Sequence, residues 1–197
     1  MLFRSLLNTA ATPFWGSRVQ PLPTLGEPFV RAFVAAFERD QPNYIGLDIG
    51  ILSEAFNLCG QRPQFFNHYI EDARLASGDA RQFVEHVKLA AERQRELDRV
   101  ELSEAFKSLP KLEQAVLENL LEKSANFRAF DAAALKFYEA KVGKKTSAAQ
   151  VQKAIEKLRD NDPPIIWKSL RGDYSLYDQD WGDWYAYLKG QQQWPPR

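Results

Sequence analysis

The sequence predicts a mainly α fold, in which a helical bundle is followed by a winged-helix domain of three helices plus a β-hairpin. Apolar residues recur at helical spacing over most of the chain beyond residue 26, with proline and glycine between the helical stretches. Two strings rich in β-branched and aromatic residues then flank a turn that contains Gly172. Three helices followed by a hairpin are the order of elements in a winged helix.

The bundle contains the longer helical stretches. Its first helix begins at Glu27-Pro28, where proline suits the first turn, and carries a stripe of apolar side chains at Phe29, Val30, Phe33, Val34 and Phe37. A second helix is expected between an N-cap at Asp48 and a C-terminal glycine at Gly60, and a third begins at Pro63. No glycine or proline interrupts residues 80 to 109, which predicts one long helix or two helices with a kink.

The winged-helix segment follows Pro110. Amphipathic patterns predict three shorter helices, at about residues 112 to 121, 131 to 138 and 147 to 158. The hairpin strands are expected within residues 164 to 170 and 174 to 177, and an aromatic closing helix within residues 181 to 188. The chain from Gln191 onward is expected to fray.

These patterns divide the chain into residues 1 to 26 as a connector, 27 to 109 as the bundle, 110 to 189 as the winged helix and 190 to 197 as a tail. Met1 to Ser5 show no capping or periodic pattern, and Leu-Phe-Arg-Ser matches a translated sequencing adapter. We therefore expect an artefact at the edge of a truncated reading frame. An ordinary N-terminal segment is the alternative.

The charge of the chain is balanced overall but uneven along it. The 26 basic and 26 acidic residues cancel, which argues against a protein that binds nucleic acid over its whole surface. Residues 128 to 171, however, hold ten Lys or Arg against five Asp or Glu, a net charge of +5. The expected winged helix therefore contains a basic segment.

Several classes of function are excluded by missing motifs. The chain has no P-loop, no G-x-G-x-x-G, no nucleophile elbow, no H-E-x-x-H and no C-x-x-C. Its single cysteine, Cys59, and its two histidines, His68 and His86, do not form a zinc pattern, so no metal site is expected. Apolar runs are too short to span a bilayer and no secretory signal is evident, so we expect a cytoplasmic protein without a membrane partner.

Two strings resemble a known family. The segment from Thr12 to Gly26, followed by the helix of Phe29 and Val30, resembles the end of the ATPase core in prokaryotic AAA+-type P-loop ATPases related to the archaeal ATPase and origin-recognition group. Leu58-Cys59-Gly60-Gln61-Arg62-Pro63 resembles the sensor-2 region of the helical lid in that family. The resemblance implies that residues 27 to 109 are the lid and that a winged helix follows it.

The resemblance also implies roles for two arginines. Arg62 would be a sensor-2-like arginine, because a guanidinium at the first turn of a helix suits phosphate binding and would stabilise charge on a γ-phosphate. Arg18 would be an arginine finger that a neighbouring subunit receives, which implies a homo-oligomer. The Walker A and Walker B strands are missing from this sequence, so the chain alone is expected to be no ATPase, and ATP and Mg²⁺ would bind only in the intact parent protein.

The basic segment suggests a nucleic-acid interface on the winged helix. Lysines and arginines there could neutralise phosphates, while a glutamine on the third helix could read base edges. The candidate DNA-binding residues are Lys144, Lys145, Gln150, Gln152, Lys153, Lys157, Lys168 and Arg171. Winged helices also bind proteins, so double-stranded DNA and a protein partner both remain open.

The preferred hypothesis is a lid and winged-helix portion of an AAA+-like ATPase, with a missing N-terminal ATPase core as its partner. The alternative is a stand-alone winged-helix transcription regulator with a helical N-terminal domain. A protein-interaction module is the third hypothesis.

Overall fold

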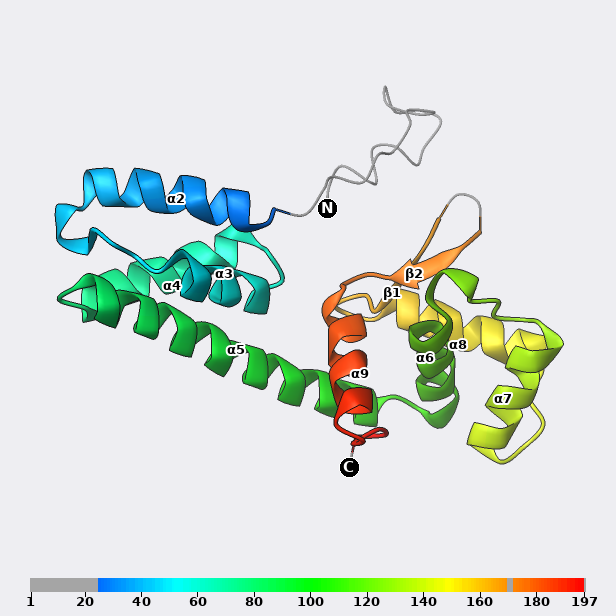
Figure 1. Cartoon of the computed structure of the whole chain (residues 1–197). Coiled ribbons are helices and arrows are strands. Elements are labelled where there is room, and N and C mark those ends of the chain that lie inside the picture. The colour runs from blue at the N-terminus through cyan, green and yellow to red at the C-terminus, as the bar shows by residue number, and fades with distance from the viewer. Residues whose placement is uncertain (1–24, 170–171, 197) are drawn as a thin grey trace, which may run out of the picture. The chain divides into compact units, whose positions relative to one another are not determined.

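The computed structural model describes residues 25–169 and 172–196, which are mainly helical with one two-stranded antiparallel sheet (Figure 1). The chain divides into two compact units, and the division lies between Arg99 and Val100. The sequence predicts the boundary between the bundle and the winged helix ten residues later, between residues 109 and 110. The division in the structure falls inside a helix. Arg18 and Arg171 lie outside the described residues.

Unit 1 contains helices α2 (Glu27–Asp40), α3 (Ile49–Leu58) and α4 (Pro63–Ala76), a 3₁₀ turn η1 (Pro42–Tyr44), and the first part of α5 (Ala80–Ser108). The predicted helix starts are confirmed: proline stands in the first turn of α2 and α4, and the Asp48 side chain accepts a hydrogen bond from Ile51 N at 3.0 Å. Residues 80 to 108 form one α-helix, which decides between the two expected arrangements.

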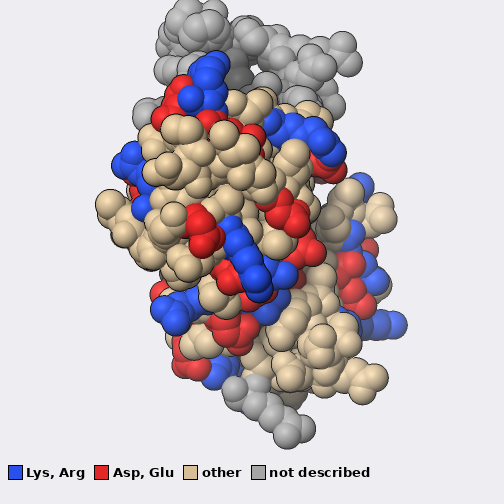
Figure 2. Space-filling view, turned by 60° about the vertical axis from the view of Figure 1, so that its left-hand side comes forward, with Lys and Arg blue, Asp and Glu red and all other residues tan. Residues whose placement is uncertain are grey.

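The core of unit 1 is aromatic. Phe56, Phe66 and Phe83 are almost completely buried, and the Phe56 and Phe66 rings meet edge to face with centroids 5.2 Å apart. Tyr44 lies over Phe83 at 5.0 Å and donates its hydroxyl hydrogen to the Ser77 carbonyl at 2.9 Å, so a buried phenol is satisfied. Charged side chains stay outside this core, and Figure 2 shows basic and acidic groups interspersed on one face of the molecule.

Unit 2 contains the end of α5, then α6 (Lys111–Lys123), η2 (Ser124–Asn126), α7 (Ala132–Val142), α8 (Ala148–Asp160), strands β1 (Ile166–Lys168) and β2 (Tyr174–Leu176), and α9 (Asp180–Gly190). The strands pair antiparallel with Trp167 opposite Ser175. Helix α6 contacts α7, α8, α9 and β2, and β1 contacts α8. The expected order of three helices, a hairpin and a closing helix is therefore present.

Helix α6 is the central element of unit 2. Leu117 is fully buried, and the buried residues of the helix include the polar side chains of Glu113, Glu118 and Asn119. Each has a partner: Lys157 Nζ lies 3.5 Å from Glu113, Lys141 Nζ lies 2.8 Å from Glu118, and Asn119 Nδ2 donates to Tyr138 Oη at 3.0 Å. Because buried polar groups are costly when unpaired, these contacts fix α7 and α8 against α6.

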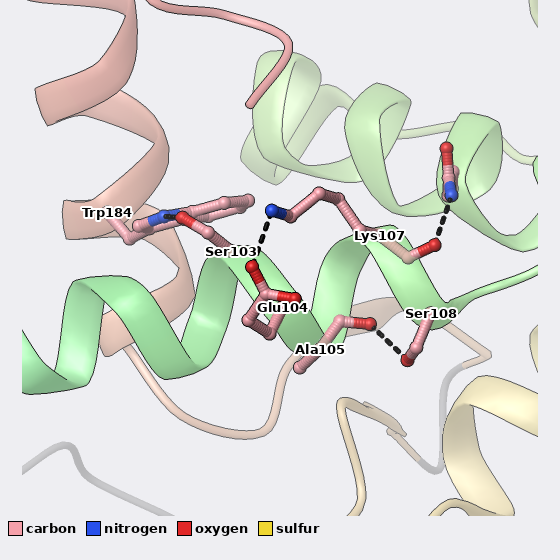
Figure 3. Close-up of polar contacts among 7 residues, drawn as sticks. Ser103, Glu104, Ala105, Lys107, Ser108 and Trp184 are labelled. Carbon is pink, nitrogen blue, oxygen red and sulfur yellow. Dashed lines mark hydrogen bonds and ion pairs between the residues drawn. The ribbon is translucent and has the colours of Figure 1, made fainter. Parts of the chain in front are cut away.

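Helix α9 is anchored to the end of α5 within the same unit. Trp184 is buried, and its indole Nε1 donates to Ser103 Oγ at 2.9 Å (Figure 3). Its ring also packs near Phe106 and, edge to face, against Trp181, with centroids 5.6 Å and 5.5 Å away. The expectation of an aromatic closing helix is confirmed.

The expectation of a frayed tail after Gln191 is wrong for the described residues. Gln192 adopts a left-handed φ of 57°, and Gln193 N donates to Leu188 O at 2.8 Å, which is the Schellman pattern that reverses a chain at a helix end. The turn brings Trp194 onto the core, where its Nε1 donates to Glu118 Oε1 at 2.8 Å and its ring meets Tyr185 at 4.6 Å. The tail is part of the folded unit.

Replacing Trp194 by alanine is expected to destabilise unit 2 by about 2 to 3 kcal/mol, because ring packing is lost and Glu118 loses a donor. Chemical denaturation of the full chain, followed by circular dichroism, measures the effect. Phe130→Ala is the control, since Phe130 is 42% exposed and should change stability by no more than about 0.5 kcal/mol. Equal effects of the two substitutions would contradict a docked tail.

Candidate nucleic-acid interface

The turn between α7 and α8 presents two lysines to solvent. Helix α7 is capped by Gly143, whose φ of 77° is the left-handed conformation that glycine adopts without strain. Lys144 and Lys145 follow and are exposed, while Thr146 is buried and donates its backbone N–H to Glu139 Oε1 at 3.2 Å. The buried Thr146 therefore fixes the turn to α7, while the side chains of Lys144 and Lys145 remain exposed to solvent.

Helix α8 has a sharply divided surface. Its buried side consists of Val151, Ala154, Ile155 and Leu158, at the spacing expected for one helical face. Lys153 lies on the exposed side, and its side chain has no hydrogen bond or ion pair among the residues that the structure describes. Lys153 therefore joins Lys144 and Lys145 as a cation without an internal partner.

Both candidate base-reading glutamines already have partners inside the helix. Gln150 completes a capping box with Ser147: its Oε1 accepts from Ser147 N at 2.9 Å, while Ser147 Oγ accepts from Gln150 N at 3.3 Å. Gln152 Nε2 donates to Glu156 Oε1 at 2.9 Å. The capping box fixes the first turn of α8, and the second contact joins neighbouring turns on its surface.

The second half of α8 carries paired charges. Lys157 lies 3.5 Å from the buried carboxylate of Glu113, although the Lys157 side chain itself is 69% exposed. Arg159 binds Asp160 through Nε at 2.7 Å and Nη2 at 3.1 Å, which raises the pKa of Arg159 and lowers that of Asp160. The second half of α8 therefore has less unpaired positive charge than the turn between α7 and α8.

The hairpin contributes one described candidate. Lys168 is exposed at the end of β1, and its Nζ lies 5.3 Å from the centroid of the Tyr174 ring on β2, within cation–π range. The structure thus brings six of the sequence candidates together on one turn and helix, places Lys168 on the strand that packs against α8, and leaves Arg171 outside the described residues.

Arg62 lies in unit 1, at the junction of α3 and α4. Helix α3 ends in a Schellman turn: Gly60, the predicted C-terminal glycine, has a φ of 63°, and Gln61 N donates to Phe56 O at 3.0 Å. Arg62 is the N-cap residue of α4, and its guanidinium lies 5.4 Å from the Phe65 ring centroid. An added Cβ at Gly60 would lie 3.3 Å from Arg62 Nε, so the side chain folds back along the turn.

Cys59 belongs to the same turn and is protonated under ordinary conditions. Burial raises the pKa of its thiol to about 11, and a backbone hydrogen bond and the charge of Arg62 only partly oppose that increase. The thiol donates to Ala55 O at 3.0 Å. The thiol is therefore a poor nucleophile at neutral pH.

The sequence interpretation missed the acidic partners of the site. Glu156 follows Gln152 by four residues, a spacing at which helical side chains meet, so that contact had a visible signal. Glu113 precedes Lys157 by more than forty residues, and no local pattern announces that pair.

No cluster of three metal-ligating side chains occurs within residues 25–169 and 172–196. None of the helices in that part of the chain is long and apolar enough to cross a membrane. Comparisons with protein-family models, with curated proteins and with solved structures find no match for this chain. The site must therefore be interpreted from its own chemistry.

Ser147→Ala is expected to destabilise unit 2 by about 1 kcal/mol, because the first turn of α8 loses its capping oxygen. Ser147→Asp should retain most of the stability, since a carboxylate accepts the same hydrogen bond. Urea denaturation compares the two variants, with Ser175→Ala on the exposed side of β2 as the control. Identical losses for the alanine and aspartate variants would show that the cap does not contribute.

The raised pKa of Cys59 predicts a loss of stability at alkaline pH. An unfolded cysteine ionises near about 8.5, whereas the folded thiol keeps its proton until about 11, so the unfolded state releases the proton first. The contribution of this thiol is complete below about pH 8.5 and declines toward pH 11. The free energies of unfolding of the wild type and of Cys59→Ser, measured as a function of pH, should diverge between about pH 8.5 and 11. Parallel curves would contradict a buried thiol.

Proposed function

We propose that unit 2 is a winged-helix module that binds double-stranded DNA through the turn at residues 143 to 147, the first half of α8 and the hairpin. The observation that carries this proposal is the group of exposed lysines without internal ion pairs, Lys144, Lys145 and Lys153, on one turn and the helix that follows it. In helix-turn-helix proteins the second helix enters the major groove by its N-terminal part. Here that part of α8 carries Lys153, and the turn that precedes the helix carries Lys144 and Lys145.

The arrangement of charge favours DNA over a protein partner. Protein interfaces that bind tightly are usually centred on exposed aromatic or apolar anchors with few lysines. The exposed residues at the start of α8 are instead Ala148, Ala149, Gln150 and Lys153, which offer small or polar side chains and positive charge. Phosphate neutralisation by such lysines supplies essentially all of the attraction in non-specific DNA binding and a large share of it in specific binding.

Lys153→Ala is expected to weaken binding to duplex DNA and to reduce the slope of log K against log[salt] by about one unit, because one phosphate contact is lost. Fluorescence anisotropy with a labelled duplex at several salt concentrations measures both effects. Lys123→Ala, on α6, is a matched control that removes an exposed lysine outside the proposed interface and should leave the slope unchanged. Absence of binding at low salt would overturn the proposal in favour of a protein partner.

A second candidate function concerns unit 1 as the lid of an AAA+-like ATPase. It is favoured by the position of Arg62 at the N-cap of a 14-residue helix whose first turn has no acidic residue, a setting that favours anions. ATP and Mg²⁺ would be held by a separate ATPase core that carries the P-loop, and Arg62 would reach the terminal phosphate. The proposed DNA-binding module could equally belong to a stand-alone transcription regulator.

The role of Arg62 is testable in a complex or longer polypeptide that contains the ATPase core. Arg62→Ala should lower ATP turnover by at least about tenfold, because charge on the transferred phosphoryl group loses a cation. Arg39→Ala, an exposed arginine on α2, is the control and should leave turnover unchanged. Unchanged turnover in Arg62→Ala would contradict a sensor-2 role.

A further inference from the structure

We infer that the α8 interface recognises the phosphate backbone of duplex DNA and does not discriminate between base sequences. This inference rests on the proposed DNA-binding function and specifies its substrate class. It follows from the hydrogen bonds of the two α8 glutamines: each side chain already has one of its two polar atoms hydrogen-bonded within the protein, whereas bidentate reading of a base edge needs both atoms.

Sequence is read mainly by hydrogen bonds of Arg, Lys, Asn and Gln with base edges, and the most specific of these contacts are bidentate. In α8 the residues of these types are Gln150, Gln152, Arg159 and the two lysines, Lys153 and Lys157. Gln150 is held by the backbone N–H and hydroxyl of Ser147 at 2.9 Å and 3.1 Å, and Arg159 makes its two contacts with Asp160. Gln152 donates its amide hydrogen to Glu156.

The competing interactions are of similar strength. A good bidentate contact discriminates between bases by about 5- to 150-fold. A typical intramolecular hydrogen bond, such as the one that Gln150 Oε1 accepts from Ser147 N, favours folding by a factor of about 2 to 13. Turning Gln150 toward a base therefore sacrifices much of what the base contact would supply, and the net preference for one base is small.

The remaining residues of the exposed face carry little sequence information. Ala148 and Ala149 can offer only an apolar contact to a thymine methyl group, and Lys153 is a single flexible cation suited to phosphate. Glu156 and Asp160 repel phosphates in the second half of the helix. Contacts with the DNA are therefore limited to the first half of α8 and to the preceding turn, which contains Lys144 and Lys145.

The test is binding of the full chain to three duplexes of equal length, one A·T-rich, one G·C-rich and one mixed, at two salt concentrations. We expect dissociation constants within about threefold of one another and a steep, equal salt dependence for all three. A preference of more than about tenfold for one duplex would overturn this inference while leaving DNA binding intact. Failure to bind any of them at low salt would overturn the proposed function itself.

Two glutamine variants sharpen the result. Gln150→Ala and Gln152→Ala should each leave affinity for every duplex within about twofold, whereas Lys153→Ala should weaken all three by a similar factor. Circular dichroism melting verifies that Gln150→Ala, which loses half of the capping box, remains folded. A loss of affinity in either glutamine variant that is confined to one duplex would show base reading and contradict the inference.

Discussion

The burial of α6 is the constraint on which unit 2 depends. Because the helix contacts α7, α8, α9 and β2, its polar side chains cannot all reach water, and each buried one needs a partner from another element. Glu118 illustrates the consequence: its Oε1 accepts from Lys141 of α7 and from the indole of Trp194, so a single carboxylate ties a helix and the C-terminal tail to α6. Removing either donor would leave a buried charge less well compensated.

The burial of the α6 carboxylates also determines which lysines on the surface of unit 2 are left without an ion pair. Lys141 and Lys157 each have a carboxylate partner on α6, so a basic segment with a net charge of +5 in sequence is less positive at its surface than its composition suggests. Three lysines lack an ion pair among the described residues of the α7–α8 turn and the exposed face of α8: Lys144, Lys145 and Lys153. The proposed interface is therefore small and lies where α8 begins.

Local chemistry explains how much of the fold could be predicted. Pro28, Asp48, Gly60 and Pro63 mark helix ends by backbone geometry and capping, which depend only on near neighbours, and the structure has them in those roles. The docked tail could not be predicted in this way, since Trp194 meets Glu118 across 76 residues, and the turn that directs it has glutamine rather than glycine in the left-handed position. The acidic partners of the candidate interface also differ in how well the sequence predicts them. Glu156 lies one helical turn from Gln152 and could be predicted, whereas Glu113 meets Lys157 only in the folded chain.

Nuclear magnetic resonance tests the central claim, that unit 2 binds duplex DNA at the start of α8, most directly. Backbone amide shifts of the full chain would be followed while an unlabelled duplex is added at low salt. We predict that the largest changes fall within residues 143 to 153 and near Lys168, with little change along α2, α3 and α4. Shifts concentrated in unit 1, or no shifts at saturating DNA, would contradict the account.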